Sequence, residues 1–131
     1  MILYGTMAQV VGILFALLVA ASPASAADAN VRGDWRVSFS VPRGIESCTL
    51  VIQQQRDGKI AGTVVSEDGE FPLKGTIAGD DLTVVWSVPE QGDQLEITVK
   101  AKVRGDTING TARLGTLGEG SLSGQRTSRV E

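Results

Sequence analysis

The sequence predicts an all-β protein, an eight-stranded antiparallel up-and-down barrel preceded by a signal peptide. Three observations predict this fold: short segments alternate apolar and polar residues, turn residues separate them, and a four-residue unit recurs. The unit is an apolar residue, a variable residue, Gly, and then Thr or Gln, and it occupies residues 60–63, 73–76, 108–111 and 122–125. Glycine at a fixed place in a strand is typical of small barrels, where strands bend or approach a neighbour closely.

The first 26 residues are predicted to be a secretory signal peptide. An apolar run over residues 10–21 precedes Ala24 and Ala26, which fit the A-x-A cleavage pattern. No Lys or Arg precedes this run, so an uncleaved membrane anchor is the alternative, although the run is short for a bilayer span. Cleavage near Ala26 would leave residues 27–131 as a single β-barrel domain, periplasmic or secreted and without stable membrane insertion.

Alternation and turns define the strands in order. The first, residues 31–41, has an apolar residue or Gly at every second position, a period that predicts a half-buried strand. The Asp-Gly pair at 57–58 predicts the hairpin turn between the second and third strands, and similar turns separate the others. The eight strands are expected at residues 31–41, 47–55, 60–65, 71–77, 82–88, 95–103, 108–114 and 122–126.

The short connections favour a closed barrel over an open sheet. A meander of consecutive hairpins leaves two unpaired edges, and closure removes them. A seven- or eight-stranded sandwich is the alternative fold. An eight-stranded barrel has an interior that side chains can fill or that can hold one small ligand.

Whether the interior is full depends on one layer of small residues. Either the glycines in this layer let the strands coil tightly, or they leave a slot for an apolar ligand. Gln54 and Arg126 are the polar residues predicted to point inward, where they would orient such a ligand. The candidate ligand-binding residues are Trp35, Gln54, Trp86 and Arg126, and the structural glycines are Gly33, Gly62, Gly75, Gly110 and Gly124.

Composition limits the function classes. The chain has no His, which removes the commonest general base, the usual catalytic triads and most zinc sites. Acidic pairs such as Asp80 and Asp81 fall in predicted turns, where acidic residues are ordinary. The net charge of −3 without a basic stripe argues against nucleic acid as a partner. We therefore expect a monomer that is not an enzyme and has no metal site and no cofactor.

Cys48 is the single cysteine, so an intramolecular disulfide cannot form. Stability must come from the core instead. The inward position of Cys48 in the second strand predicts a buried, unreactive thiol, with an intermolecular bridge as the alternative.

Two segments far apart in the chain resemble a known superfamily. Gly33-Asp34-Trp35 is similar to the G-x-W signature of the calycins, which include lipocalins, fatty-acid-binding proteins and avidins. In that group an Arg of the last strand packs across the Trp ring at the closed end of the barrel, and Arg126 is the matching position. The resemblance implies a small secreted bacterial barrel of calycin-like type, without the C-terminal helix and disulfides of lipocalins.

A second resemblance is to the periplasmic barrel inhibitors of bacterial metalloproteases. Those proteins have a Trp in the first strand and a Cys in the next, as Trp35 and Cys48 are placed here, but their partner Cys has no counterpart in this sequence.

Two functions are therefore expected. The first is binding of a small hydrophobic molecule, and the alternative is binding of another exported protein through loops or through residues 27–30.

Overall fold

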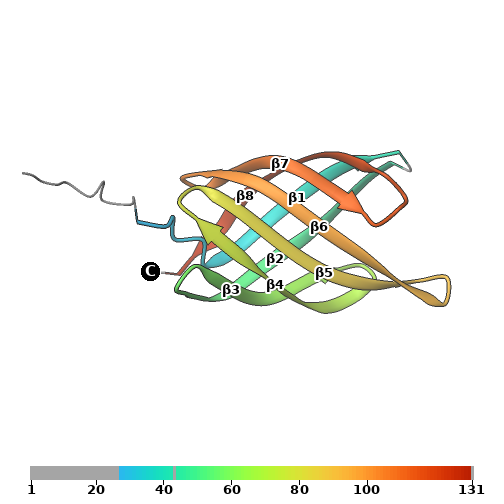
Figure 1. Ribbon diagram of the computed structural model, residues 1–131, viewed down its shortest axis with the longest axis horizontal. Coiled ribbons are helices and arrows are strands. Elements are labelled where there is room, and N and C mark those ends of the chain that lie inside the picture. The colour runs from blue at the N-terminus through green and yellow to red at the C-terminus, as the bar shows by residue number, and fades with distance from the viewer. Residues whose placement is uncertain (1–26, 43, 131) are drawn as a thin grey trace, which may run out of the picture.

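The computed structural model describes residues 27–42 and 44–130, which form a closed antiparallel barrel (Figure 1). Each strand pairs with its neighbour in sequence, and the last strand returns to pair with the first. This closure confirms the predicted eight-stranded barrel and excludes the sandwich alternative. The predicted signal peptide, residues 1–26, lies outside the described residues. The strands are β1 (Gly33–Val41), β2 (Gly44–Arg56), β3 (Lys59–Ser66), β4 (Gly69–Ala78), β5 (Asp81–Glu90), β6 (Asp93–Arg104), β7 (Thr107–Leu114) and β8 (Glu119–Arg129).

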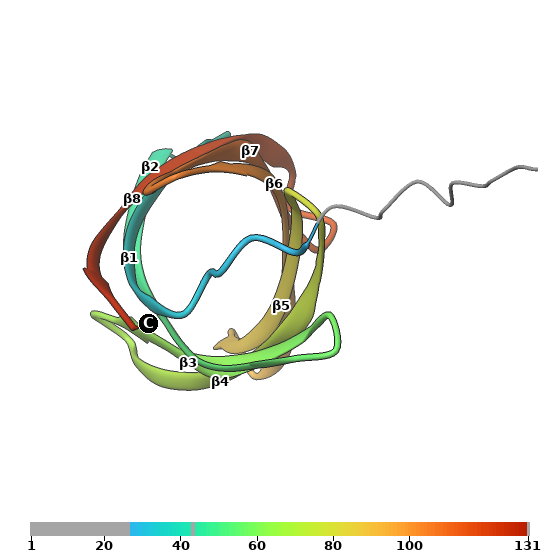
Figure 2. The same cartoon turned by 90° about the vertical axis from the view of Figure 1, so that its left-hand side faces the viewer.

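The two ends of the barrel carry different connections. One end carries the turns β2–β3, β4–β5 and β6–β7 together with residues 28–32, which cross it (Figure 2). We call this the closed end. The opposite end carries the connections β1–β2, β3–β4, β5–β6 and β7–β8, and we call it the open end (Figure 1).

Apolar side chains from all eight strands fill the interior. Along β1 and β6 every second residue is buried, as the period-two alternation predicts. Trp35 and Val37 of β1, Val84 of β5 and Val99 of β6 have no exposed surface at all. The middle of the barrel is therefore a packed core.

The predicted inward orientation of Gln54 is wrong. The register between β2 and β3 shifts between Ile52 and Gln54, so that Ile52 lies opposite Gly62 and Gln54 lies opposite Ala61. One extra residue in a strand reverses the alternation beyond it. As a result Gln54 is exposed, and Gln55 is half-buried in its place.

Three glycines of the repeated unit mark places where adjacent backbones nearly touch. A Cβ added at Gly62, Gly75 or Gly110 would lie 1.9 Å from a carbonyl oxygen of the neighbouring strand. This geometry supports tight coiling of the strands and leaves no slot beside these glycines. The oxygens belong to Val51, Thr83 and Lys100, respectively.

Gly75→Ala is expected to lower the free energy of unfolding by about 3 kcal/mol, because the new methyl group cannot fit without moving the β5 backbone. Urea denaturation followed by circular dichroism measures this change. Gly92→Asn is the control, since nothing lies within 4 Å of a Cβ added there and Asn tolerates its φ of +83°. A Gly75→Ala variant as stable as the wild type would contradict the close approach of the two strands.

Candidate ligand-binding site

The closed end is built around the indole ring of Trp35. This residue has no exposed surface, and the guanidinium carbon of Arg126 lies 4.5 Å from the centroid of its ring. The side chain of Arg126 is itself only 2% exposed. A guanidinium over an indole face is a favourable cation–π pair, particularly when water is excluded. The stacking of Arg126 on Trp35, which the calycin resemblance implies, is confirmed.

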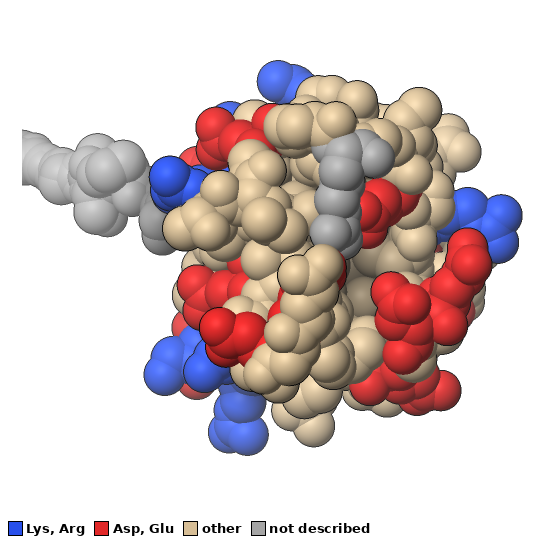
Figure 3. All heavy atoms as spheres, turned by 90° about the vertical axis from the view of Figure 1, so that its right-hand side faces the viewer, with Lys and Arg blue, Asp and Glu red and all other residues tan. Residues whose placement is uncertain are grey.

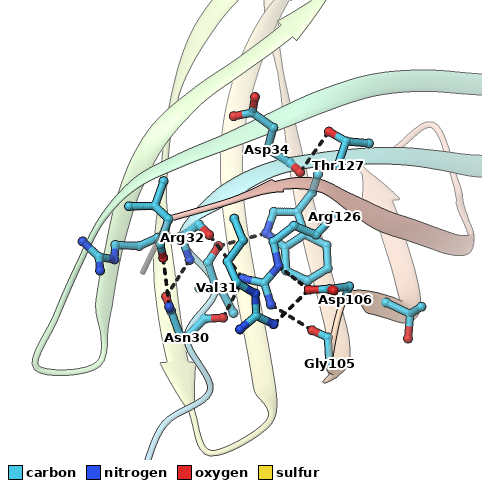
Figure 4. Close-up of polar contacts among 12 residues, drawn as sticks. Asn30, Val31, Arg32, Asp34, Gly105, Asp106, Arg126 and Thr127 are labelled. Carbon is cyan, nitrogen blue, oxygen red and sulfur yellow. Dashed lines mark hydrogen bonds and ion pairs between the residues drawn. The ribbon is translucent and has the colours of Figure 1, made fainter.

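Arg126 also connects three segments through hydrogen bonds (Figure 4). Its Nη1 donates to the carbonyl oxygens of Asn30 and Arg32, at 2.8 and 3.2 Å. Its Nη2 donates to the carbonyl oxygen of Gly105 at 2.9 Å, and its Nε donates to Oδ1 of Asp106 at 2.8 Å. The planar guanidinium thus joins β8 to the β6–β7 turn and to the chain before β1.

Residues 28–32 form what we call the N-terminal plug, which crosses the closed end (Figure 2). The half-buried Gln55 holds it through two bonds that the β2 bulge makes possible. The bonds of the plug to the rest of the barrel include Gly79 N to Asp28 Oδ1 (2.8 Å), Ala29 N to Gly79 O (2.9 Å), Gln55 Nε2 to Ala29 O (2.8 Å), Val31 N to Gln55 Oε1 (2.8 Å) and Trp35 Nε1 to Val31 O (2.9 Å). Trp35 and Arg126 therefore have structural roles at this end.

The open end contains a cavity of about 370 Å³. Its apolar lining consists of side chains that point inward from five strands, namely Phe39, Cys48, Val64, Trp86, Val88 and Ile97. Its rim is polar and comprises Glu46, Ser47, Ser66, Glu67, Asp68 and Glu90, with the exposed Ile45 and with Pro89 beside them. Figure 3 looks onto this end and shows acidic side chains around it.

Strand pairing explains how the cavity lining is assembled. Trp86 of β5 lies directly opposite Ile97 of β6, and Phe39 of β1 lies opposite Glu46 of β2. Residues directly opposite each other on one face of an antiparallel pair have neighbouring side chains. Trp86, Phe39 and Ile97 are only 4 to 5% exposed, so they form the floor where the cavity meets the packed core.

The four residues predicted to bind a ligand are separated in the structure. Trp86 lines the open-end cavity, whereas Trp35 and Arg126 meet at the closed end. Gln54 lies on the outer surface and lines a shallow groove with Arg56 and Lys59. The acidic rim was not predicted, because its residues fall in predicted turns or near strand ends. The inward position of Gln55 was not predicted either, because no residue pattern indicates the bulge.

Cys48 is half-buried on the wall of the cavity. Burial, and secondly the negative charge of Glu46, raises the pKa of its thiol from 9.0 to about 12. The thiol is therefore protonated at neutral pH and is a poor nucleophile, in line with the unreactive thiol expected.

Residues 27–42 and 44–130 contain no group of three or more Cys, Asp or Glu side chains placed to hold a metal ion. Within the same ranges, no helix is long and apolar enough to cross a membrane.

Comparison with known proteins leaves the chain without an assigned family. No protein-family model matches the sequence, and no curated protein is significantly similar to it. The architecture itself, an eight-stranded closed antiparallel barrel, fits a calycin-like fold in general.

Asp106→Asn is expected to destabilise the protein at neutral pH but not in acid. Hydrogen bonds from Arg129 and then Arg126 lower the pKa of the Asp106 carboxyl below its usual 3.8. A carboxyl with a lowered pKa in the fold stabilises it above the usual value, and this contribution is lost as the pH falls through the folded value. Urea midpoints at neutral pH and at about pH 2.5 measure the difference.

The control for this experiment is Asp57→Asn, in the β2–β3 turn at the same end of the barrel. The gap between the wild type and Asp106→Asn should close in acid, while the gap for the control should stay small throughout. A gap for Asp106→Asn that is equally large at both pH values would contradict the role assigned to its carboxylate.

Cys48 in the folded protein is expected to react with iodoacetamide at least about tenfold more slowly than in the urea-unfolded chain, at about pH 8. The cause is its raised pKa, which keeps the thiolate scarce. Mass spectrometry of timed samples gives both rates. The double variant Cys48→Ser/Val65→Cys is the control, because Val65 is 38% exposed on the outside of β3 and its thiol should react quickly in both states. Equal rates for Cys48 in the two states would refute its protection.

Proposed function

We propose that the protein is a non-catalytic binding protein, secreted or periplasmic, that holds a small apolar ligand at the open end of its barrel. The observation that supports this function is the cavity of about 370 Å³, which has apolar side chains at its base and a polar rim that supplies most of its exposed surface. Small-molecule sites in proteins are concave, combine apolar side chains with a few polar groups, and have volumes of roughly 300–1,000 Å³. The cavity lies near the lower limit, so the ligand is small.

The packed core sets how deeply a ligand enters. Phe39, Trp86 and Ile97 close the cavity from below, and the core beneath them has no exposed surface at Val84 and Val99. An apolar group smaller than the 370 Å³ of the cavity fits above this floor. Any larger part of the ligand stays at the rim, where polar side chains and water meet it.

The calycin-like character of the barrel supports the same function. The G-x-W segment at Gly33 and the stacking of Arg126 on Trp35 are two features of that superfamily, and they lie at the end opposite the cavity. The predicted signal peptide over residues 1–26 supports export.

Binding of another exported protein is the second candidate function. It is favoured by two exposed apolar side chains at the open end, Ile45 at 78% and Leu117 at 48% exposure. The contact surface would be formed by the loops of this end. Within residues 27–30, the other segment expected to contact a partner, Asp28 and Ala29 are hydrogen-bonded to the closed end, and we therefore propose the loops of the open end as the contact surface.

Fluorescence titration with N-phenyl-1-naphthylamine, an uncharged apolar dye, tests the ligand-binding function. The wild type should enhance the dye emission in a saturable way. Val88→Trp should weaken dye binding by at least about tenfold, since the larger side chain fills a cavity of this size. Val65→Trp is the matched control because Val65 is exposed on the outer face of β3, and it should bind like the wild type.

Each of two outcomes would contradict the proposal. In the first, the wild type fails to bind the dye at all. In the second, Val88→Trp, with a wild-type circular dichroism spectrum, binds the dye as well as Val65→Trp does. Native mass spectrometry of the exported protein would then identify any molecule that copurifies with it.

A further inference from the structure

Part of the barrel wall beside the open-end cavity is formed by two strands that do not pair with each other. Among the described residues, β4 pairs with β5 only over residues 74–78 and 81–85, and Lys74 opposite Val85 is the last pair. Both strands nevertheless continue toward the open end, β4 over residues 69–73 and β5 over residues 86–90. We call these two segments the seam.

Each strand of the seam is paired on its other side. β4 pairs with β3 as far as Gly69 opposite Ser66, and β5 pairs with β6 as far as Glu90 opposite Asp93. Figure 1 shows the β5–β6 hairpin reaching beyond the β3–β4 turn at the open end. The wall is therefore continuous within each hairpin, and the two hairpins can separate at the seam without breaking a ladder.

Two prolines explain why the ladder between β4 and β5 ends. Hydrogen-bonded pairs alternate with other pairs along an antiparallel ladder, and a two-residue turn begins this alternation with a hydrogen-bonded pair. Counted from the turn at 79–80, a longer ladder would next need the N–H groups of residues 72 and 87, and then those of residues 70 and 89. Residues 72 and 89 are prolines, which have no N–H to donate. Each further pair would therefore lack one of its two hydrogen bonds, and neither edge is a good template for another strand.

The cavity adjoins the seam. Trp86 and Val88, which line the cavity, belong to the β5 side of the seam, and Val64, another lining residue, lies opposite Phe71 of β4. None of the described residues of β4 lines the cavity itself. Phe71 shares the inner face of β4 with the buried Leu73, and it is half-buried and packs against the core. Its side chain therefore stands at the seam, beside the cavity.

We infer that a small apolar molecule enters and leaves the cavity through the seam, and that Phe71 is the side chain that must move to let it pass. This inference rests on the proposed function. Passage over the rim is the alternative route, and it leads across the exposed carboxylates of Glu67 and Asp68. The inner face of the seam is apolar at Phe71 and Val88, so an apolar molecule passing there disturbs fewer hydrated groups.

A gate and a wall residue affect binding kinetics differently. A side chain that only obstructs the passage raises the barrier to entry and to exit equally, so it leaves the affinity unchanged. A side chain that contacts the bound molecule changes the affinity, mainly through the dissociation rate. Because Phe71 does not line the cavity, we expect the first behaviour from it.

Stopped-flow mixing with N-phenyl-1-naphthylamine measures both rate constants. Phe71→Ala should raise the association and dissociation rate constants together, each by at least about threefold, and leave the dissociation constant within about twofold of the wild-type value. Val65→Ala is the matched control, because Val65 is exposed on the outer face of the neighbouring strand β3, and it should keep both wild-type rates. Circular dichroism checks that both variants fold.

A disulfide across the seam tests the route independently of Phe71. Pro72→Cys/Ser87→Cys, in a Cys48→Ala background, places two thiols at exposed positions where the next hydrogen-bonded pair of the ladder would lie. Oxidation should slow dye association at least about tenfold, and reduction should restore the rate. The matched control is Thr76→Cys/Thr83→Cys in the same background, because these residues already lie opposite each other. Its association rate should be the same oxidised and reduced, and mass spectrometry verifies both disulfides.

The outcomes separate this inference from the proposed function. Failure of the wild type to bind the dye would overturn the function itself. Dye association that the seam disulfide leaves unchanged would leave the function standing and overturn the seam as the route. A Phe71→Ala variant with an altered dissociation constant and a wild-type association rate would place Phe71 in the cavity wall and overturn its role as a gate. Where the disulfide does not form, the rates of Phe71→Ala alone decide between the seam and the rim.

Discussion

Closure of the sheet between β1 and β8 is the constraint on which the rest of the structure depends. A sheet of eight short strands closes only if the strands coil strongly, and strong coiling brings neighbouring backbones together. Gly62, Gly75 and Gly110 stand where a side chain would meet the next strand at 1.9 Å. The tight curvature that follows leaves an interior that apolar side chains of the described residues fill in the middle, and the cavity lies at one end.

The same strands form a hydrogen-bonded, covered end on one side of the barrel and a cavity on the other. At the closed end, the guanidinium of Arg126 lies over the Trp35 ring and donates hydrogen bonds to backbone carbonyls of the N-terminal plug and of the β6–β7 turn. At the open end, the described residues of the connections border the cavity, and Ile45 and Leu117 are exposed there. Packing at one end thus supports the binding site that we propose at the other, because the strands that line the cavity are fixed by the packed end.

The alternation of apolar and polar residues was sufficient to predict the strands. It failed for features that depend on tertiary structure. Period-two alternation located all eight strands. The predicted inward orientation of Trp35 and Arg126 was correct, because no bulge falls between each residue and the neighbouring core residues of its own strand. Gln54 was misplaced because a single extra residue in β2 left no trace in the sequence. The cavity rim could not be predicted, since Glu46, Glu67 and Glu90 meet only after the sheet has closed.

The contacts of the N-terminal plug also determine when the fold can be completed. Its partners include Arg126 and the carbonyl oxygen of Val130, and these hydrogen bonds join residues that are 94 to 100 positions apart. Pairings of such high contact order form late and slowly, because a long loop must close before they contribute. A chain emerging gradually from a ribosome or a translocon cannot seal the barrel until β8 has appeared. The fold is therefore suited to assembly after release in a single concerted step, and a precursor exported as we propose would stay unfolded while it is still being threaded.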